Sequence, residues 1–150
     1  MADLQQLKAI YAAYEREARE EKQKAPPFAG FLGWGDDPRN APCHNRFYEA
    51  VGEWTEAFLA EDRENDSIFE AVRWLICAPA ETAEPEAYWY MYAAQGFARP
   101  MLSSLLQQQR IQLKEFFDTH YPRRDRMPVQ EEIYKVLSKE TGRKKWGLFR

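Results

Sequence analysis

The sequence predicts an all-α protein, an irregular bundle of about six helices with a long apolar loop, containing glycine and proline, between the first two. Apolar residues recur at spacings of three and four along most of the 150 residues, which is the period of an amphipathic helix. No segment alternates with a period of two between turn residues, as a β-strand would. The connections are short and the helices unequal in length, so an irregular bundle is expected rather than a regular coiled coil.

The first helix is predicted over residues 3–24, and the prolines at 26 and 27 end it. Its last ten residues are charged on every side and are expected to project into water. Its apolar face comprises Leu4, Leu7, Tyr11, Tyr14 and Ala18.

The second helix is predicted from about Cys43 to Asp62, with one apolar side and one acidic, solvated side. The apolar side comprises Phe47, Val51, Trp54 and Phe58, widened by Tyr48 and Thr55. The acidic side comprises Glu49, Glu53 and Glu56.

The third helix is predicted to open at Ser67, which has the spacing of a capping box with Glu70, and to end at Pro79. The fourth is predicted from Pro85, a favoured first helical residue, to Ala94. This fourth helix is apolar all round, which is typical of a helix buried on several sides.

The fifth helix is predicted from about Pro100 to Tyr121, with Ile111 on the side away from its apolar stripe. That stripe comprises Leu102, Leu105, Leu106, Leu113, Phe116 and Phe117, with His120 in line. The sixth helix is predicted to begin at Pro128 and to be capped by Gly142. Its inward-facing residues are Val129, Ile133, Val136 and Leu137.

A loop is predicted from residue 28, where the sequence begins FAGFLGWGDD. Its glycines at 30, 33 and 35 raise the question of phosphate binding. Phosphate-cradling loops follow a strand, and none is predicted here, while Asp36 and Asp37 would repel a phosphate. The apolar side chains at 28, 31, 32 and 34 predict instead a segment packed on the bundle. It covers either the core, the favoured interpretation, or a ligand pocket.

The segment YWYMYAAQGFARP, residues 88–100, carries the most unusual chemistry, because buried tyrosine hydroxyls and an indole N–H need hydrogen-bond partners. Two interpretations remain open: an inter-helix hydrogen-bond network, which is favoured, or a small polar-aromatic pocket beneath the loop at 28–34. The candidate pocket residues are Trp34, His44, Tyr48, Tyr88, Tyr92, Gln95 and Gln109.

Specific catalytic and metal-binding patterns are missing from the sequence. Cys43, His44, Cys77 and His120 have none of the usual zinc-ligand spacings, so no metal and no cofactor is expected. No nucleophile, general base or pair of carboxylates is marked out, so no catalytic residue is assigned and an enzyme is disfavoured.

The charge is unevenly distributed along the chain, whose net charge is −3. Residues 1–109 carry 18 acidic against 10 basic residues, whereas residues 110–150 carry 11 basic against 6 acidic. Such asymmetry is typical of a nucleic-acid surface or of two faces that attract each other, and the second is favoured. The candidates for nucleic-acid contact are Arg123, Arg124, Arg126, Arg143, Lys144 and Lys145.

The composition indicates a single all-helical domain over residues 1–150, with 143–150 as a docking tail. A mean hydropathy of −0.71, two cysteines, no export signal and no membrane-length apolar run predict a soluble, cytoplasmic protein with no membrane contact. The leading functional hypothesis is protein association, either with itself, for example as a homodimer, or with a partner. The alternatives are a nucleic-acid-associated regulator and a small-molecule binder or enzyme.

Overall fold

The computed structural model describes residues 2–24 and 41–147, with side chains described as far as residue 138 except at 85 and 86. Every regular element in these two ranges is helical, which confirms the all-α prediction. The segment at 28–34, with Trp34, lies outside the described residues. Across the described ranges, no helix is long and apolar enough to cross a membrane.

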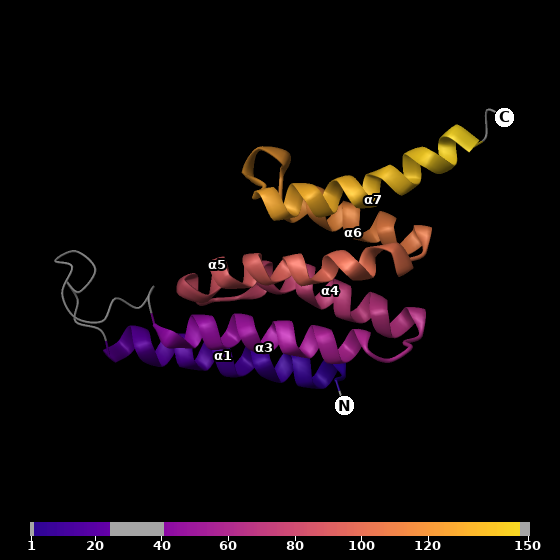
Figure 1. The fold of residues 1–150 in the computed structure, drawn as a ribbon. Helices are drawn as coiled ribbons and strands as arrows, with labels where there is room; N and C mark the ends of the chain where they lie inside the picture. The colour runs from indigo at the N-terminus through magenta and orange to yellow at the C-terminus, as the bar shows by residue number, and fades with distance from the viewer. Residues whose placement is uncertain (1, 25–40, 148–150) are drawn as a thin grey trace.

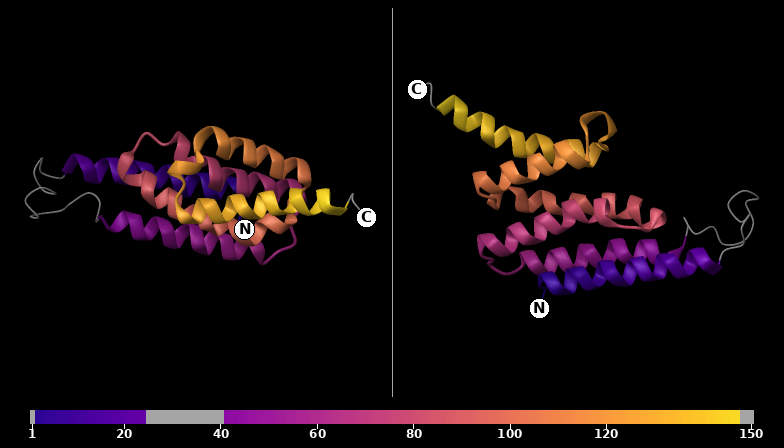
Figure 2. Two further views of the ribbon diagram at one scale, coloured as in Figure 1. Left: turned by 90° about the horizontal axis from the view of Figure 1, so that it is seen from above. Right: turned by 180° about the vertical axis from the view of Figure 1, so that it is seen from behind.

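The helices stack in three layers (Figure 1). In chain order the elements are α1 (Leu4–Lys24), α3 (Pro42–Leu59), α4 (Asn65–Glu81), α5 (Pro85–Ala94), the 3₁₀ segment η2 (Gln95–Ser104), α6 (Gln107–His120), the 3₁₀ turn η3 (Arg123–Asp125) and α7 (Pro128–Gly147). One outer layer holds α1 and α3, the middle layer holds α4 with α5 and η2, and the other outer layer holds α6 and α7. The view from behind in Figure 2 shows the same order.

The first layer forms because α1 and α3 bury the stripes that the sequence predicts. The buried residues of α1 are Leu7, Tyr11, Tyr14 and Ala18. Those of α3 include Phe47, Val51, Trp54 and Phe58. The rings of Tyr14 and Phe47 stack with centroids 4.1 Å apart. Burial of large side chains of this kind contributes roughly 1.5–3 kcal/mol each.

The two ends predicted for the third helix are both wrong. α4 begins at Asn65 rather than Ser67, and Asn65 Nδ2 donates to the Ser104 carbonyl, so a tertiary contact fixes this start. Pro79 lies inside α4, which continues to Glu81. Proline removes one helical hydrogen bond, but so close to the end no later turn depends on it, and Pro79 is buried in the core.

The fourth predicted helix is correct in extent but is not buried all round. On α5, Ala87 and Met91 are fully buried, whereas the side chain of Trp89 is 59% exposed. The neighbouring elements cover α5 on the sides of α3 and α4 and leave an edge open.

The fifth predicted helix is in fact two elements with a break between them. η2 carries Pro100 and runs to Ser104, and Leu105 and Leu106 are then extended, with ψ of 144° and 157°. α6 starts only after them, so Leu106 is 57% exposed instead of lying on the stripe. His120 is also exposed and stacks on Phe116, with centroids 4.2 Å apart, so it is not buried in line with the stripe.

The last helix begins at Pro128, as predicted, but it continues to Gly147, so Gly142 does not cap it. Glycine can continue a helix, at a cost of about 1 kcal/mol relative to alanine. Ile133 and Leu137 are fully buried, whereas Val136 is exposed. Gln130 is fully buried on the inward side of α7, where the sequence predicted only apolar residues.

Candidate functional site

His44 is buried in the first turn of α3 and connects three helices. Its Nδ1 shares a hydrogen bond of 2.6 Å with the hydroxyl of Tyr14 from α1. Its ring stacks on Tyr90 from α5, with centroids 4.2 Å apart and an angle of 4° between the planes. The geometry gives His44 a structural role in the core of the α1, α3 and α5 contact.

Tyr88 and Tyr92 lie on a different side of α5 from Tyr90, because residues two apart on a helix do not face the same way. Their hydroxyls are hydrogen-bonded to each other. The Tyr92 ring packs edge-on against Tyr121, at the end of α6, with centroids 5.7 Å apart. The structure therefore does not bring His44 together with Tyr88 and Tyr92.

Gln95 and Tyr121 complete a buried polar cluster around one carbonyl of α4. Gln95 Nε2 donates to the Ile76 oxygen at 2.8 Å, and the Tyr121 hydroxyl donates to the same oxygen at 2.6 Å. Gln95 is fully buried, and its Oε1 has no hydrogen-bond partner among the described residues. These contacts join α4, η2 and the end of α6 as an inter-helix network.

Burial suppresses the ionisation of this cluster. It raises the pKa of Tyr121 well above the ordinary value for a tyrosine, and the nearby Tyr92 phenol raises it further. Burial and the Tyr88 hydroxyl likewise raise the pKa of Tyr92. Burial, followed by the charge of Glu81, raises the pKa of Cys77 to about 11, so this thiol is protonated and unreactive at neutral pH.

Gln109 caps α6 and lies apart from the other candidate pocket residues. Its Oε1 accepts from the backbone N–H of Leu106 at 2.9 Å, and its Nε2 donates to Asn65 Oδ1 at 2.7 Å. The amide thus satisfies an N–H at the start of α6 and ties that start to α4. This capping role explains why the Gln109 amide stands at helical spacing between Leu105 and Leu113.

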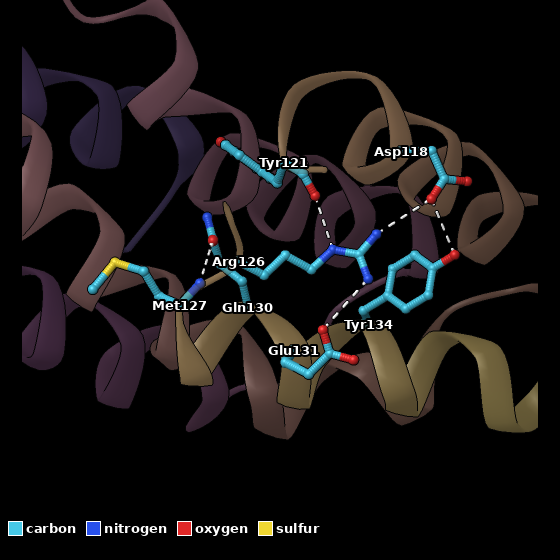
Figure 3. Close-up of polar contacts among 7 residues, drawn as sticks. All are labelled: Asp118, Tyr121, Arg126, Met127, Gln130, Glu131 and Tyr134. Atoms are coloured by element: carbon cyan, nitrogen blue, oxygen red, sulfur yellow. Dashed lines mark hydrogen bonds and ion pairs between the residues drawn. The ribbon is translucent and has the colours of Figure 1, made fainter. Parts of the chain in front are cut away.

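Arg126 is held between α6 and α7, where its side chain is only 4% exposed (Figure 3). Its Nε donates to the Tyr121 carbonyl at 2.8 Å, and its outer nitrogens lie 3.3 Å from Asp118 and 3.5 Å from Glu131. The guanidinium carbon lies 3.8 Å from the centre of the Tyr134 ring, whose hydroxyl donates to Asp118. Arg126 is therefore committed to contacts within the chain.

The other basic candidates are placed differently. Arg123 and Arg124 are exposed on η3, and Arg123 borders an open hollow of about 690 Å³ between α6 and α7 that Arg126 and Lys135 also line. The side chains of Arg143, Lys144 and Lys145 lie outside the described residues. The described part thus leaves two of the six candidates free to meet a phosphate.

A second hollow runs along α3, beside η2, and has a volume of about 380 Å³. We call it the α3–η2 groove; it is lined by Tyr48, Glu49, Gly52, Glu53, Thr55, Glu56, Leu59 and Phe97. Tyr48 and Leu59 are 43% and 44% exposed, so the prediction that Tyr48 widens the buried stripe is wrong. The Tyr48 ring instead lies against Phe97, with centroids 4.9 Å apart.

Sequence reasoning missed this groove, because it assigned Tyr48 to the core and the three glutamates to a plain solvated face. The sequence feature that could have indicated the groove is Gly52, in the middle of a helix that is otherwise clearly amphipathic. A glycine inside a helix frequently marks a close approach by another group, here the ring of Phe97.

Metal binding finds no support in the described ranges, where no group of three or more His, Cys, Asp or Glu side chains is placed to hold an ion. No family model, curated protein or solved structure matches this chain.

Proposed function

We propose that the protein functions by protein association and that the α3–η2 groove binds an amphipathic, basic helix of a partner. The observation that carries this proposal is a groove on α3 with the exposed apolar residues Tyr48 and Leu59 at its two ends and three glutamates along its border. A groove that receives the apolar face of a helix is a recurrent mode of protein recognition.

The apolar part of the groove has the spacing of one helix face. Tyr48, Gly52, Thr55 and Leu59 follow at intervals of four, three and four residues. Phe97 from η2 forms the second wall. Tyr48 and Leu59 are exposed at the two ends of this line, and Phe97 is partly exposed beside it. Apolar side chains gathered on one surface are typical of an interaction site.

The charged border of the groove indicates the sign of the partner's charge. Glu49, Glu53 and Glu56 are exposed, and none forms an ion pair with a cation among the described side chains. Like charges three and four residues apart destabilise a helix by roughly 0.2–0.5 kcal/mol per pair. Lysines or arginines on a bound helix would relieve this repulsion, which supports a basic partner.

The proposal is tested with a fluorescent synthetic helix made of leucine and lysine, with one apolar and one basic face. We expect saturable binding in fluorescence anisotropy, weakened about tenfold in the E53K/E56K variant because two favourable charge pairs become repulsive. The matched control is E70K/E115K, which changes the net charge equally at exposed sites on α4 and α6.

A peptide with glutamates in place of the lysines tests whether the groove prefers a basic partner. We expect this acidic peptide to bind at least tenfold more weakly than the leucine–lysine helix. Equal binding of both peptides, or equal weakening by the control variant, would contradict the proposal.

A further inference from the structure

We propose that the occupant of the α3–η2 groove is residues 143–150 of a second copy of this chain, exchanged reciprocally between two protomers. This inference rests on the proposed function, because it names the partner for the same groove. Three observations support it: the charges, the placement of α7, and the length of the groove.

The segment 143–150, RKKWGLFR, complements the groove in both charge and apolarity. It holds four cations and no acid, and its remaining side chains are mostly large and apolar. The apolar members are Trp146, Leu148 and Phe149. The groove presents three glutamates without cationic partners in the described part, around exposed Tyr48 and Leu59. The same asymmetry divides the chain as a whole, with the acidic excess before residue 110 and the basic excess after it.

The placement of α7 favours a contact between copies over one within a copy. α3 and α7 lie in opposite outer layers, with the middle layer between them (Figure 1). The last turns of α7 extend past the ends of the other helices and away from the α3 layer, as Figure 1 and the view from behind in Figure 2 show. The helix backbone at residues 143–147 therefore points away from the groove of its own chain, which favours the groove of a second copy.

The groove and the segment also match in length. From Tyr48 to Leu59 the helix rises about 17 Å, at about 1.5 Å per residue. Eight residues span about 12 Å as a helix and about 26 Å when extended, and the length of the groove lies between these two values.

Reciprocal exchange explains how so small a contact gives a stable assembly. Each protomer contributes one segment and one groove, so a two-fold axis doubles the buried surface and closes the assembly at two copies. The attraction between exposed charges is screened by salt, so the dimer is expected to weaken as ionic strength rises.

Sedimentation equilibrium of the full chain tests the inference, over a range of protein concentrations and at two salt concentrations. We expect a monomer–dimer equilibrium whose dissociation constant rises with salt. E53K/E56K in the groove and K144E/K145E in the segment should each raise that constant about tenfold or more. The controls E70K/E115K and R123E/R124E carry equal charge changes on exposed residues elsewhere and should change it less than twofold.

Mixing E53K/E56K with K144E/K145E shows whether each variant fails to dimerise because its charges no longer match or because it is misfolded. In a mixed dimer the E53K/E56K groove meets the K144E/K145E segment, and the wild-type groove meets the wild-type segment, so we expect the dimer to return. A mixture that stays monomeric, or a wild-type dimer insensitive to E53K/E56K, would overturn the inference.

The same experiment distinguishes the inference from the function on which it rests. A wild-type chain that is monomeric throughout, but whose groove still binds the leucine–lysine helix, overturns the exchange and leaves the proposed function standing. A groove that binds neither the synthetic helix nor residues 143–150 overturns both.

Discussion

Gly52 and Phe97 lie so close together that a Cβ atom on residue 52 would stand 3.3 Å from the Cζ atom of the ring. That distance is shorter than most real Cβ contacts, so the ring occupies the place of a side chain on α3. A helical glycine costs about 1 kcal/mol relative to alanine. The contact joins α3 to η2, where the Phe97 ring forms the second wall of the α3–η2 groove.

Gly52→Ala is expected to weaken binding of the leucine–lysine helix while leaving the free energy of unfolding within about 1 kcal/mol of wild type. The gain in helix propensity is offset by displacement of the Phe97 ring. Urea unfolding and fluorescence anisotropy measure the two quantities. Since the effect acts through the ring, G52A should change affinity much less in an F97A background, and additive effects would contradict this explanation.

Tyr14→Phe is expected to lower the free energy of unfolding by about 1–2 kcal/mol, because it removes the buried hydroxyl that bonds to His44. Chemical unfolding monitored by circular dichroism measures the loss. Tyr48→Phe is the matched control, since it removes the hydroxyl of an exposed tyrosine on α3. Equal effects of the two changes would show that the Tyr14 to His44 contact is not stabilising.

Arg126→Ala is expected to lower the free energy of unfolding by about 3 kcal/mol, because it leaves the Tyr121 carbonyl and Asp118 without their buried partner. Arg126→Lys should recover only part of this loss, since an ammonium cannot reproduce the planar contact with Tyr134. Thermal unfolding compares both with Arg123→Ala, at an exposed position on η3. A loss at Arg123 as large as at Arg126 would contradict the internal role of Arg126.

Cys77 is expected to make the fold less stable as the pH rises from 9 to 11. Burial, followed by the charge of Glu81, raises the pKa of this thiol from 9.0 to about 11 in the folded chain. The unfolded chain releases the proton first, so it binds fewer protons over this range and stability falls as pH rises. Urea unfolding of Cys77→Ala should show a shallower decline between pH 9 and 11. If stability fell as steeply in Cys77→Ala as in wild type, other titrating groups would account for the pH dependence.

The sequence predicts most of the fold because the apolar stripes of α1 and α3 carry a clear helical period. It fails where tertiary contacts decide the outcome. Pro79 is tolerated at the end of α4 because the core encloses it, and the break after η2 depends on the extended torsions of Leu105 and Leu106. Periodicity alone carries no information on either point.

The candidate pocket residues are separated for a simpler reason. A helix turns about 100° per residue, so Tyr90 and Tyr92 face different neighbours although they are close in sequence. His44 joins Tyr90, whereas Tyr92 joins Tyr121. Tyr48 enters the groove because η2 brings Phe97 beside α3, and no local sequence pattern predicts that packing.

The most direct test of the central claim is an NMR titration of the ¹⁵N-labelled full chain with the unlabelled leucine–lysine helix. We expect the largest amide shifts at Gly52, Leu59 and Phe97, saturating with the peptide and absent from E53K/E56K at the same concentrations. Shifts confined to α6 and α7, or none at saturating peptide, would contradict a helix-binding role for the α3–η2 groove.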